Sequence, residues 1–218
     1  MKIGVLFDLD GTLLDTLEDL KDAVNHALRH YGLPERGLDE VRRFVGNGAA
    51  ELMRLALPGQ PGDPDVGEAL ACFQAYYKEH ASVKTAPYAG VIEALRAVGE
   101  KYPIAVVSNK PDAATKLLCA KVFPGVYALG ESPVCPHKPA PDMVHKAMAD
   151  LGIDGCVYVG DSEVDVLTAK NAAVPCLSVL WGFRDKQLLA DAGAKYYCEK
   201  AEQLSATIER IIEEVYGT

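Results

Sequence analysis

The strongest constraint on the fold lies in residues 3–13, with the sequence IGVLFDLDGTL. An almost wholly apolar run is typical of a strand buried on both faces, as in a parallel sheet covered by helices. The run ends in Asp8 and Asp10, which strand periodicity would direct to the same side. Two close carboxylates repel each other unless a cation or a proton is present. We therefore expect this strand end to be a functional site rather than part of the scaffold.

The two residues after the carboxylates fit a site. Gly11 allows the backbone to leave the strand sharply, and Thr12 places a hydroxyl beside the two acids. A strand that ends in a polar Asp-Gly turn is a common alternative for a single aspartate. The second aspartate, two residues away, favours the functional interpretation.

The rest of the chain divides into two regions with different patterns. From residue 87 onward, short apolar segments alternate with helical ones, and the expected strands are 104–107, 126–129, 156–159, 176–180 and a short one near Tyr196. Such alternation predicts an α/β fold with a doubly wound, Rossmann-like parallel sheet. Residues 14–84 contain only helical patterns and a Pro/Gly-rich loop. The sequence thus predicts a core of residues 1–13 and 85–218, with an inserted helical cap domain of residues 14–84.

A second strand end and a loop also carry polar residues. Ser108 and Asn109 follow the second expected strand, and Pro111 suits the first helical position. This arrangement favours either a phosphate at a helix N-terminus or an ordinary helix cap. Lys138 lies in the stiff loop Lys-Pro-Ala-Pro before another expected helix. It could supply a cation to the site, or it could be an ordinary solvated surface lysine. Ligands bind at the carboxyl ends of strands in open parallel sheets, so these residues are candidates for one site.

Acidic residues at a third strand end complete the pattern. Asp161 and Asp165 follow the expected strand 156–159. A helix N-terminus favours one acid without any function. Both acids together with Asp8 and Asp10 form an oxygen-rich cluster of the kind that Mg²⁺ prefers.

These four features, in this order, resemble the haloacid dehalogenase-like hydrolases of the phosphatase branch, over essentially the whole chain. The first of them is Asp8-Leu9-Asp10-Gly11-Thr12-Leu13-Leu14-Asp15-Thr16. The resemblance implies that Asp8 is a nucleophile that forms an aspartyl-phosphate. It implies that Asp10 first protonates the leaving oxygen and then activates water.

The same resemblance implies the remaining site residues. Mg²⁺ would be bound by Asp8, the backbone carbonyl of Asp10, and Asp161. The phosphate would be held by Thr12, Ser108, Asn109 and Lys138. Asp165 would either support the water shell of the metal or hold Lys138.

The expected cap domain carries a further likeness. Residues 42–49, RRFVGNGA, and residues 180–183, LWGF, resemble phosphoglycolate phosphatases. This implies 2-phosphoglycolate as the substrate, with its carboxylate bound by Arg42, Gly46, Asn47 and Gly48. A plain turn between helices explains the Gly-Asn-Gly tip equally well. Alternatives with the same core are a β-phosphoglucomutase-like mutase, a pyrophosphatase, a phosphatase of broad specificity and a non-catalytic binding protein.

Composition excludes several other classes. The net charge of −9 is spread over mixed acidic and basic stretches, which argues against nucleic acids or anionic membranes as partners. No apolar run reaches the roughly 20 residues of a membrane span, and the start lacks a signal-peptide pattern, so we expect a cytoplasmic protein. The six cysteines lie singly and are expected to be reduced thiols. The expected partner is a small phosphorylated metabolite, and the protein is expected to be a monomer or a homodimer.

Overall fold

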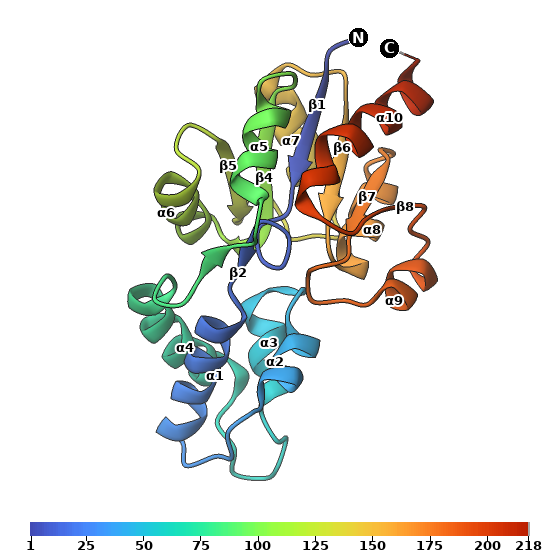
Figure 1. The fold of residues 1–218 in the computed structure, drawn as a ribbon. Coiled ribbons are helices and arrows are strands. Elements are labelled where there is room, and N and C mark those ends of the chain that lie inside the picture. The colour runs from blue at the N-terminus through green and yellow to red at the C-terminus, as the bar shows by residue number, and fades with distance from the viewer. Residues whose placement is uncertain (218) are drawn as a thin grey trace. The chain divides into compact units, whose positions relative to one another are not determined.

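The computed structural model describes residues 1–217. The chain forms two compact units, residues 1–14 with residue 87 onward, and residues 15–86. The first unit contains a six-stranded, fully parallel sheet in the order β5-β4-β1-β6-β7-β8 (Figure 1). Its strands are β1 (Ile3–Phe7), β4 (Ile104–Pro111), β5 (Tyr127–Glu131), β6 (Gly155–Gly160), β7 (Cys176–Val179) and β8 (Tyr196–Cys198). The predicted doubly wound parallel sheet is confirmed.

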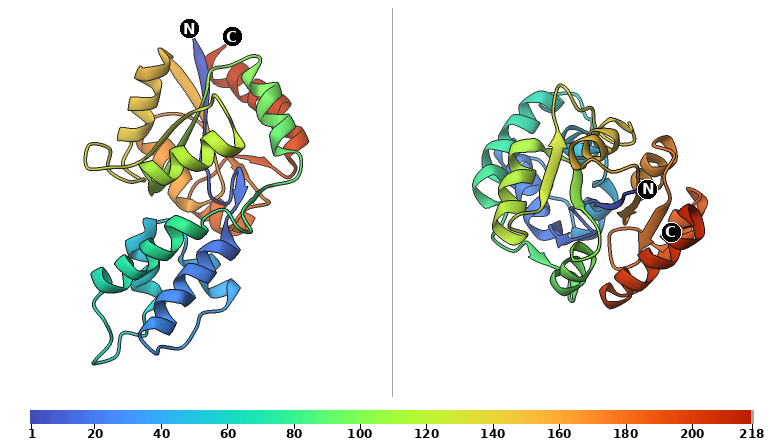
Figure 2. Two further views of the ribbon diagram at one scale, coloured as in Figure 1. Left: turned by 90° about the vertical axis from the view of Figure 1, so that its left-hand side faces the viewer. Right: turned by 90° about the horizontal axis from the view of Figure 1, so that it is seen from above.

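Helices cover both faces of this sheet. Buried residues of α5, α6 and α10 share one apolar cluster, and those of α7 and α8 share another. Figure 2 (left) shows α7 on the opposite side of the sheet from α5 and α10. The helices of this unit are α5 (Val91–Gly99), α6 (Asp112–Val122), α7 (Asp142–Leu151), α8 (Glu163–Asn171), α9 (Lys186–Asp191), the 3₁₀ turn η1 (Ala201–Gln203) and α10 (Leu204–Tyr216).

The apolar run at the start of the chain lies at the centre of the sheet. β1 pairs with β4 on one side and with β6 on the other. Val5 and Phe7 belong to the cluster under α5 and α10, whereas Leu6 belongs to the cluster under α7. Because successive side chains of a strand point to opposite faces, a strand in this position must be apolar at every residue.

The second unit consists of the helices α1 (Leu17–His30), α2 (Leu38–Phe44), α3 (Gly48–Ala56) and α4 (Val66–His80). The Asp19 carboxylate of α1 accepts hydrogen bonds from the backbone amides of Lys84 and Thr85, which fixes the segment after α4. Two short strands, β2 (Leu14–Asp15) and β3 (Ala86–Pro87), pair where the chain passes between the units. The expectation that residues 14–84 are purely helical is therefore wrong at Leu14 and Asp15.

The end of β4 also differs from the expectation. Pro111 is the residue before α6 rather than its first residue, and it still pairs with Glu131 of β5 after a register shift that follows Ser108. Pairing with β5 thus extends the strand beyond its apolar part. Among residues 1–217, every helix is too short or too polar to cross a membrane.

Candidate active site

The candidate site lies at the carboxyl ends of three neighbouring strands. Because β1 lies between β4 and β6, the residues that follow these strands meet at one edge of the sheet. Asp8 follows β1, and its backbone amide donates to the carbonyl of Val159 at 2.8 Å. Ser108 lies near the end of β4, and Asp161 follows β6.

Lys138 links the acidic residues. Its Nζ lies 2.9 Å from Oδ1 of Asp8 and 2.8 Å from Oδ1 of Asp165, and it donates to the hydroxyl of Tyr158 at 3.1 Å. The residue is only 1% exposed. Burial disfavours the charged ammonium, but attraction to Asp165 and Asp8 outweighs this and raises the pKa of Lys138 well above its usual value. The two carboxylates therefore favour the charged form of Lys138.

The Asn109 side chain positions Lys138. Its Nδ2 donates to the carbonyl of Lys138 at 3.0 Å, and its Oδ1 accepts from the amide of Lys138 at 2.6 Å. The peptide bond between Lys138 and Pro139 is cis. A residue in the loop after β5 is thus fixed to the end of β4 by two reciprocal hydrogen bonds.

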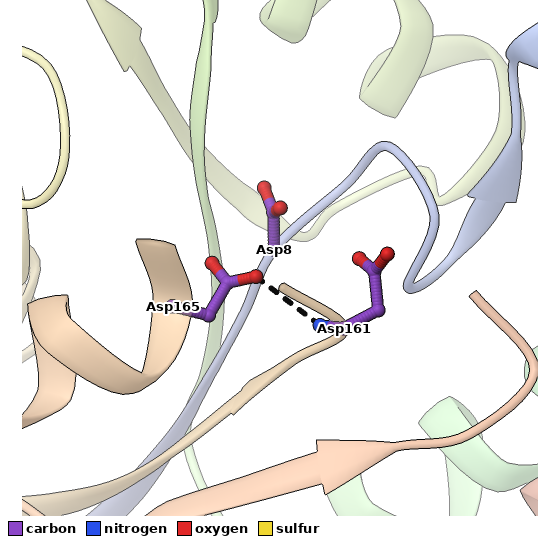
Figure 3. Close-up of side chains that lie close together, drawn as sticks. All are labelled: Asp8, Asp161 and Asp165. Carbon is purple, nitrogen blue, oxygen red and sulfur yellow. Dashed lines mark hydrogen bonds between the residues drawn. The ribbon is translucent and has the colours of Figure 1, made fainter. Parts of the chain in front are cut away.

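Asp165 is held on all sides. Its Oδ2 accepts from the backbone amide of Asp161 at 3.1 Å (Figure 3). The same oxygen accepts from the amide and the hydroxyl of Ser162 at 3.0 Å and 2.7 Å. Its Oδ1 faces Lys138. Both oxygens of this fully buried carboxylate are thus engaged by groups of the protein.

The carboxylates of Asp8, Asp161 and Asp165 form a compact cluster, with one oxygen of each within 4.8 Å of the others (Figure 3). Burial, opposed by Lys138 and reinforced by Asp165 and Asp161, raises the pKa of Asp8 well above its usual value. Burial and the charge of Asp165 raise the pKa of Asp161 to about 7. Three buried carboxylates beside one ammonium carry excess negative charge, so the cluster fits a divalent cation.

Asp10 has a separate partner. Its Oδ2 lies 3.1 Å from Nζ of Lys110, and its Oδ1 is buried without a hydrogen-bond partner among the described residues. The charged groups that act on the pKa of Asp8 are Lys138, Asp165 and Asp161. β1 ends at Phe7, so strand periodicity does not extend to Asp10.

Two hydroxyl groups complete the site. The Oγ1 of Thr12 donates to Oδ1 of Asp161 at 2.8 Å. The Oγ of Ser108 accepts from the amide of Lys110 at 3.2 Å. A hydroxyl that accepts this bond can also donate its own proton, so Ser108 is chemically able to bind a phosphate oxygen.

The expected residues of the cap loop belong to the second unit. Arg42 lies in α2, 3.8 Å from Asp39, and Asn47 is the residue before α3. Gly46 and Gly48 have φ values of 132° and 79°, which other residues rarely adopt. The structure thus brings together Asp8, Asp10, Thr12, Ser108, Asn109, Lys138, Asp161 and Asp165 in the first unit, and places Arg42, Gly46, Asn47 and Gly48 in the second.

Sequence reasoning assigned no role in the site to four residues that contact it, although residues 180–183 were already noted for their resemblance to phosphoglycolate phosphatases. Lys110 directly follows Ser108 and Asn109, so its position at a strand end was a usable signal. Tyr158 could not be recognised, because an aromatic residue within an apolar strand is expected for packing alone. The indole of Trp181 donates to the carbonyl of Thr12 at 3.0 Å, and the amide of Phe183 donates to Asp161 at 2.8 Å. No spacing rule links these loop residues to Asp161.

Comparison with known proteins agrees with this arrangement. Residues 5–179 match the family model of the haloacid dehalogenase-like hydrolases. The chain is 35% identical to Phosphoglycolate phosphatase 1 of Pseudomonas aeruginosa, over 86% of this chain and 72% of the relative. It is also 35% identical to a phosphoglycolate phosphatase of Rhodobacter capsulatus, over 86% of this chain and 89% of the relative.

A crystal structure from Lactobacillus delbrueckii subsp. bulgaricus, named provisionally as a phosphoglycolate phosphatase, has the same fold. It superposes with a TM-score of 0.86 at 33% identity and covers 94% of this chain and 97% of its own. A match to the family model over most of the chain, together with these relatives, shows that the protein belongs to the haloacid dehalogenase-like hydrolases.

Proposed function

We propose that this protein is a Mg²⁺-dependent phosphatase that hydrolyses a small phosphomonoester, 2-phosphoglycolate, through an aspartyl-phosphate intermediate. The observation that carries the proposal is the buried Asp8 carboxylate, held by Lys138 at 2.9 Å beside the acidic oxygens of Asp161. A carboxylate in this position is a nucleophile with its charge partners already in place. Relatives named phosphoglycolate phosphatase support the choice of substrate.

In the first step, an oxygen of Asp8 attacks phosphorus and the bond from phosphorus to the ester oxygen breaks. Oδ1 of Asp8 accepts from the amide of Leu9 at 2.7 Å and contacts Lys138, which fixes the carboxylate plane. The leaving oxygen takes a proton from Asp10. The hydroxyl of Ser108 and the ammonium of Lys138 stabilise the charge on the transferring phosphoryl group.

In the second step, Asp10 removes a proton from water, and the resulting hydroxide attacks phosphorus. The bond between phosphorus and Asp8 breaks, which releases inorganic phosphate and regenerates the carboxylate. Division into two steps replaces one difficult displacement by two easier ones, and the same acid serves both.

Asp8, Asp161 and the backbone carbonyl of Asp10 would hold the metal ion. The fit rests on the excess of carboxylates over ammonium groups in the buried cluster. Bound Mg²⁺ would neutralise negative charge on the phosphate. Asp165, whose oxygens are engaged by Lys138 and by residues 161 and 162, is assigned to the positioning of Lys138.

We assign substrate choice to the helical unit, as the cap domain of the enzyme. Arg42 and the loop of Gly46, Asn47 and Gly48 offer a guanidinium and backbone amides, which are suitable donors for a small carboxylate. The fold of this unit does not by itself identify the substrate.

The test is kcat/KM for a panel of 2-phosphoglycolate, glucose phosphates, pyrophosphate and nucleotides, with and without Mg²⁺. We expect turnover that requires Mg²⁺ and strongly favours 2-phosphoglycolate. A flat profile would retain the mechanism but reject the assigned substrate. Absence of Mg²⁺-dependent phosphate release from every compound would reject the catalytic proposal.

A further inference from the structure

Both oxygens of the Asp161 carboxylate are held by parts of the chain that are distant in sequence. The hydroxyl of Thr12, in the loop after β1, donates to Oδ1 at 2.8 Å. The backbone amide of Phe183, in the loop after β7, donates to Oδ2 at 2.8 Å. Each oxygen therefore retains lone-pair capacity for a cation, while the plane of the carboxylate is fixed.

Two glycines enclose the same carboxylate. A Cβ atom on Gly182 would lie 2.3 Å from Cβ of Asp161, and one on Gly11 would lie 2.3 Å from its Oδ2. Contacts this short do not occur between real atoms, so any side chain at Gly182 would displace Asp161. Gly182 does not need the left-handed backbone conformation, whereas Gly11 has a φ of 84°. The absence of a side chain at Gly182 therefore allows the loop to approach Asp161 closely.

Trp181 connects the two loops that hold Asp161. Its Nε1 donates to the carbonyl of Thr12 at 3.0 Å, and the hydroxyl of the same Thr12 contacts Asp161. The indole ring also packs against the apolar cluster of the sheet. A half-buried indole N–H requires an acceptor, so this bond orients the loop as well as the ring. Trp181 is the one tryptophan in the sequence.

We propose that the segment from Trp181 to Phe183 is a positioning element that fixes Asp161 for metal binding, with the indole N–H as its anchor. This inference rests on the proposed function, because it concerns the same metal site. It adds residues that touch neither the phosphate nor the reacting atoms. Removal of such outer partners typically weakens metal affinity by about 10- to 100-fold.

The experiment is a calorimetric titration of Mg²⁺ into the full-length protein and its variants. Trp181→Phe keeps an aromatic ring but removes the N–H donor, and we expect the Kd for Mg²⁺ to rise roughly tenfold. Gly182→Ala, which displaces Asp161 directly, is expected to raise it further. The matched control is Tyr216→Phe, which removes one bond of 2.9 Å from a half-buried ring to the carbonyl of Cys156, away from the site.

A second readout separates positioning from a merely structural role. For Trp181→Phe, the Mg²⁺ concentration that gives half-maximal activity should rise, while kcat at saturating Mg²⁺ and KM for the phosphoester return close to the wild-type values. A distorted core would lower kcat at every Mg²⁺ concentration, and that result would overturn the inference.

The outcomes distinguish the two proposals. If Trp181→Phe and Gly182→Ala bind Mg²⁺ as tightly as Tyr216→Phe, the positioning role is rejected and the metal site stands. If the wild-type protein itself binds no Mg²⁺, the proposed function fails. Thermal unfolding without Mg²⁺ checks folding, and Gly182→Ala provides the decisive comparison if Trp181→Phe does not fold.

Discussion

Nζ of Lys110 lies 3.1 Å from Oδ2 of Asp10, and both side chains are largely buried at the edge of the sheet. The other oxygen of Asp10 has no partner among the described residues. The lysine thus fixes one oxygen of the carboxylate, and in the proposed mechanism the second oxygen would carry the proton that passes to the substrate.

Lys110→Met should therefore impair proton donation by Asp10. We expect kcat to fall by roughly tenfold or more for an alkyl phosphate, because a positioned general acid contributes about 10²–10⁴-fold. An aryl phosphate with a good leaving group should be affected much less. Lys116→Met, which breaks an exposed pair with Asp112, is the control. Equal losses for both kinds of substrate would contradict this role.

Asp8→Asn should abolish turnover without unfolding the protein. The amide cannot form the phosphoenzyme, so phosphate release should fall to background. Burial raises the pKa of Asp8, so a neutral amide removes a buried charge, and Lys138 keeps Asp165 as its ion-pair partner at 2.8 Å. The Mg²⁺-free variant should therefore stay folded, with a Tm close to that of the wild type. Thermal unfolding and a phosphate assay measure both effects. Near-normal activity would exclude the covalent mechanism.

Lys138→Met should destabilise the fold at neutral pH. It leaves Asp8 and Asp165 buried without their shared cation, and removal of one partner from a buried ion pair costs about 3–5 kcal/mol. Chemical denaturation gives the free energy of unfolding. Lys146→Met, which breaks an exposed pair with Asp150, should change it by less than about 1 kcal/mol. Similar values for the two variants would show that the buried cation contributes little to stability.

The effect of Mg²⁺ on stability should depend on pH. In the folded protein the pKa of Asp161 is raised to about 7, so its contribution to stability is complete below about pH 4 and is lost as the pH rises toward 7. Mg²⁺ binds the ionised form, so the increase in Tm on its addition should be larger near pH 8 than near pH 5. Asp161→Asn should remove most of this increase. An equal increase at both pH values in the wild type would contradict the assignment.

Much of the core could be predicted from the sequence, because buried positions of helices and strands recur as apolar residues at regular spacing. Val5, Leu6 and Phe7 are apolar in succession, which only a strand with two covered faces requires. The polar residues after such strands, among them Asp8, Ser108 and Asp161, could be expected to meet because parallel strands end at one edge. The end of β4 was less predictable, since pairing with β5 extends it to Pro111.

The partners of these residues could not be predicted. Asp8 and Asp10 are neighbours in sequence, yet Lys138 holds one and Lys110 holds the other. The resemblance implies that Asn109 binds phosphate, and nothing in the sequence indicates that two of its hydrogen bonds also position Lys138. Such pairings depend on how loops from different strands pack, and spacing along the chain carries no record of them.

The sequence by itself determined which residue types stand at the strand ends, because secondary structure and burial follow local periodicity. Only the tertiary structure decided which oxygen faces which donor. Asp161 shows the difference. Its position after a buried strand can be predicted from the sequence, whereas its contacts with Thr12 and Phe183 come from the loops that follow β1 and β7. Hydrogen bonds depend on distances of a few ångströms between side chains, and only the packed fold sets those distances.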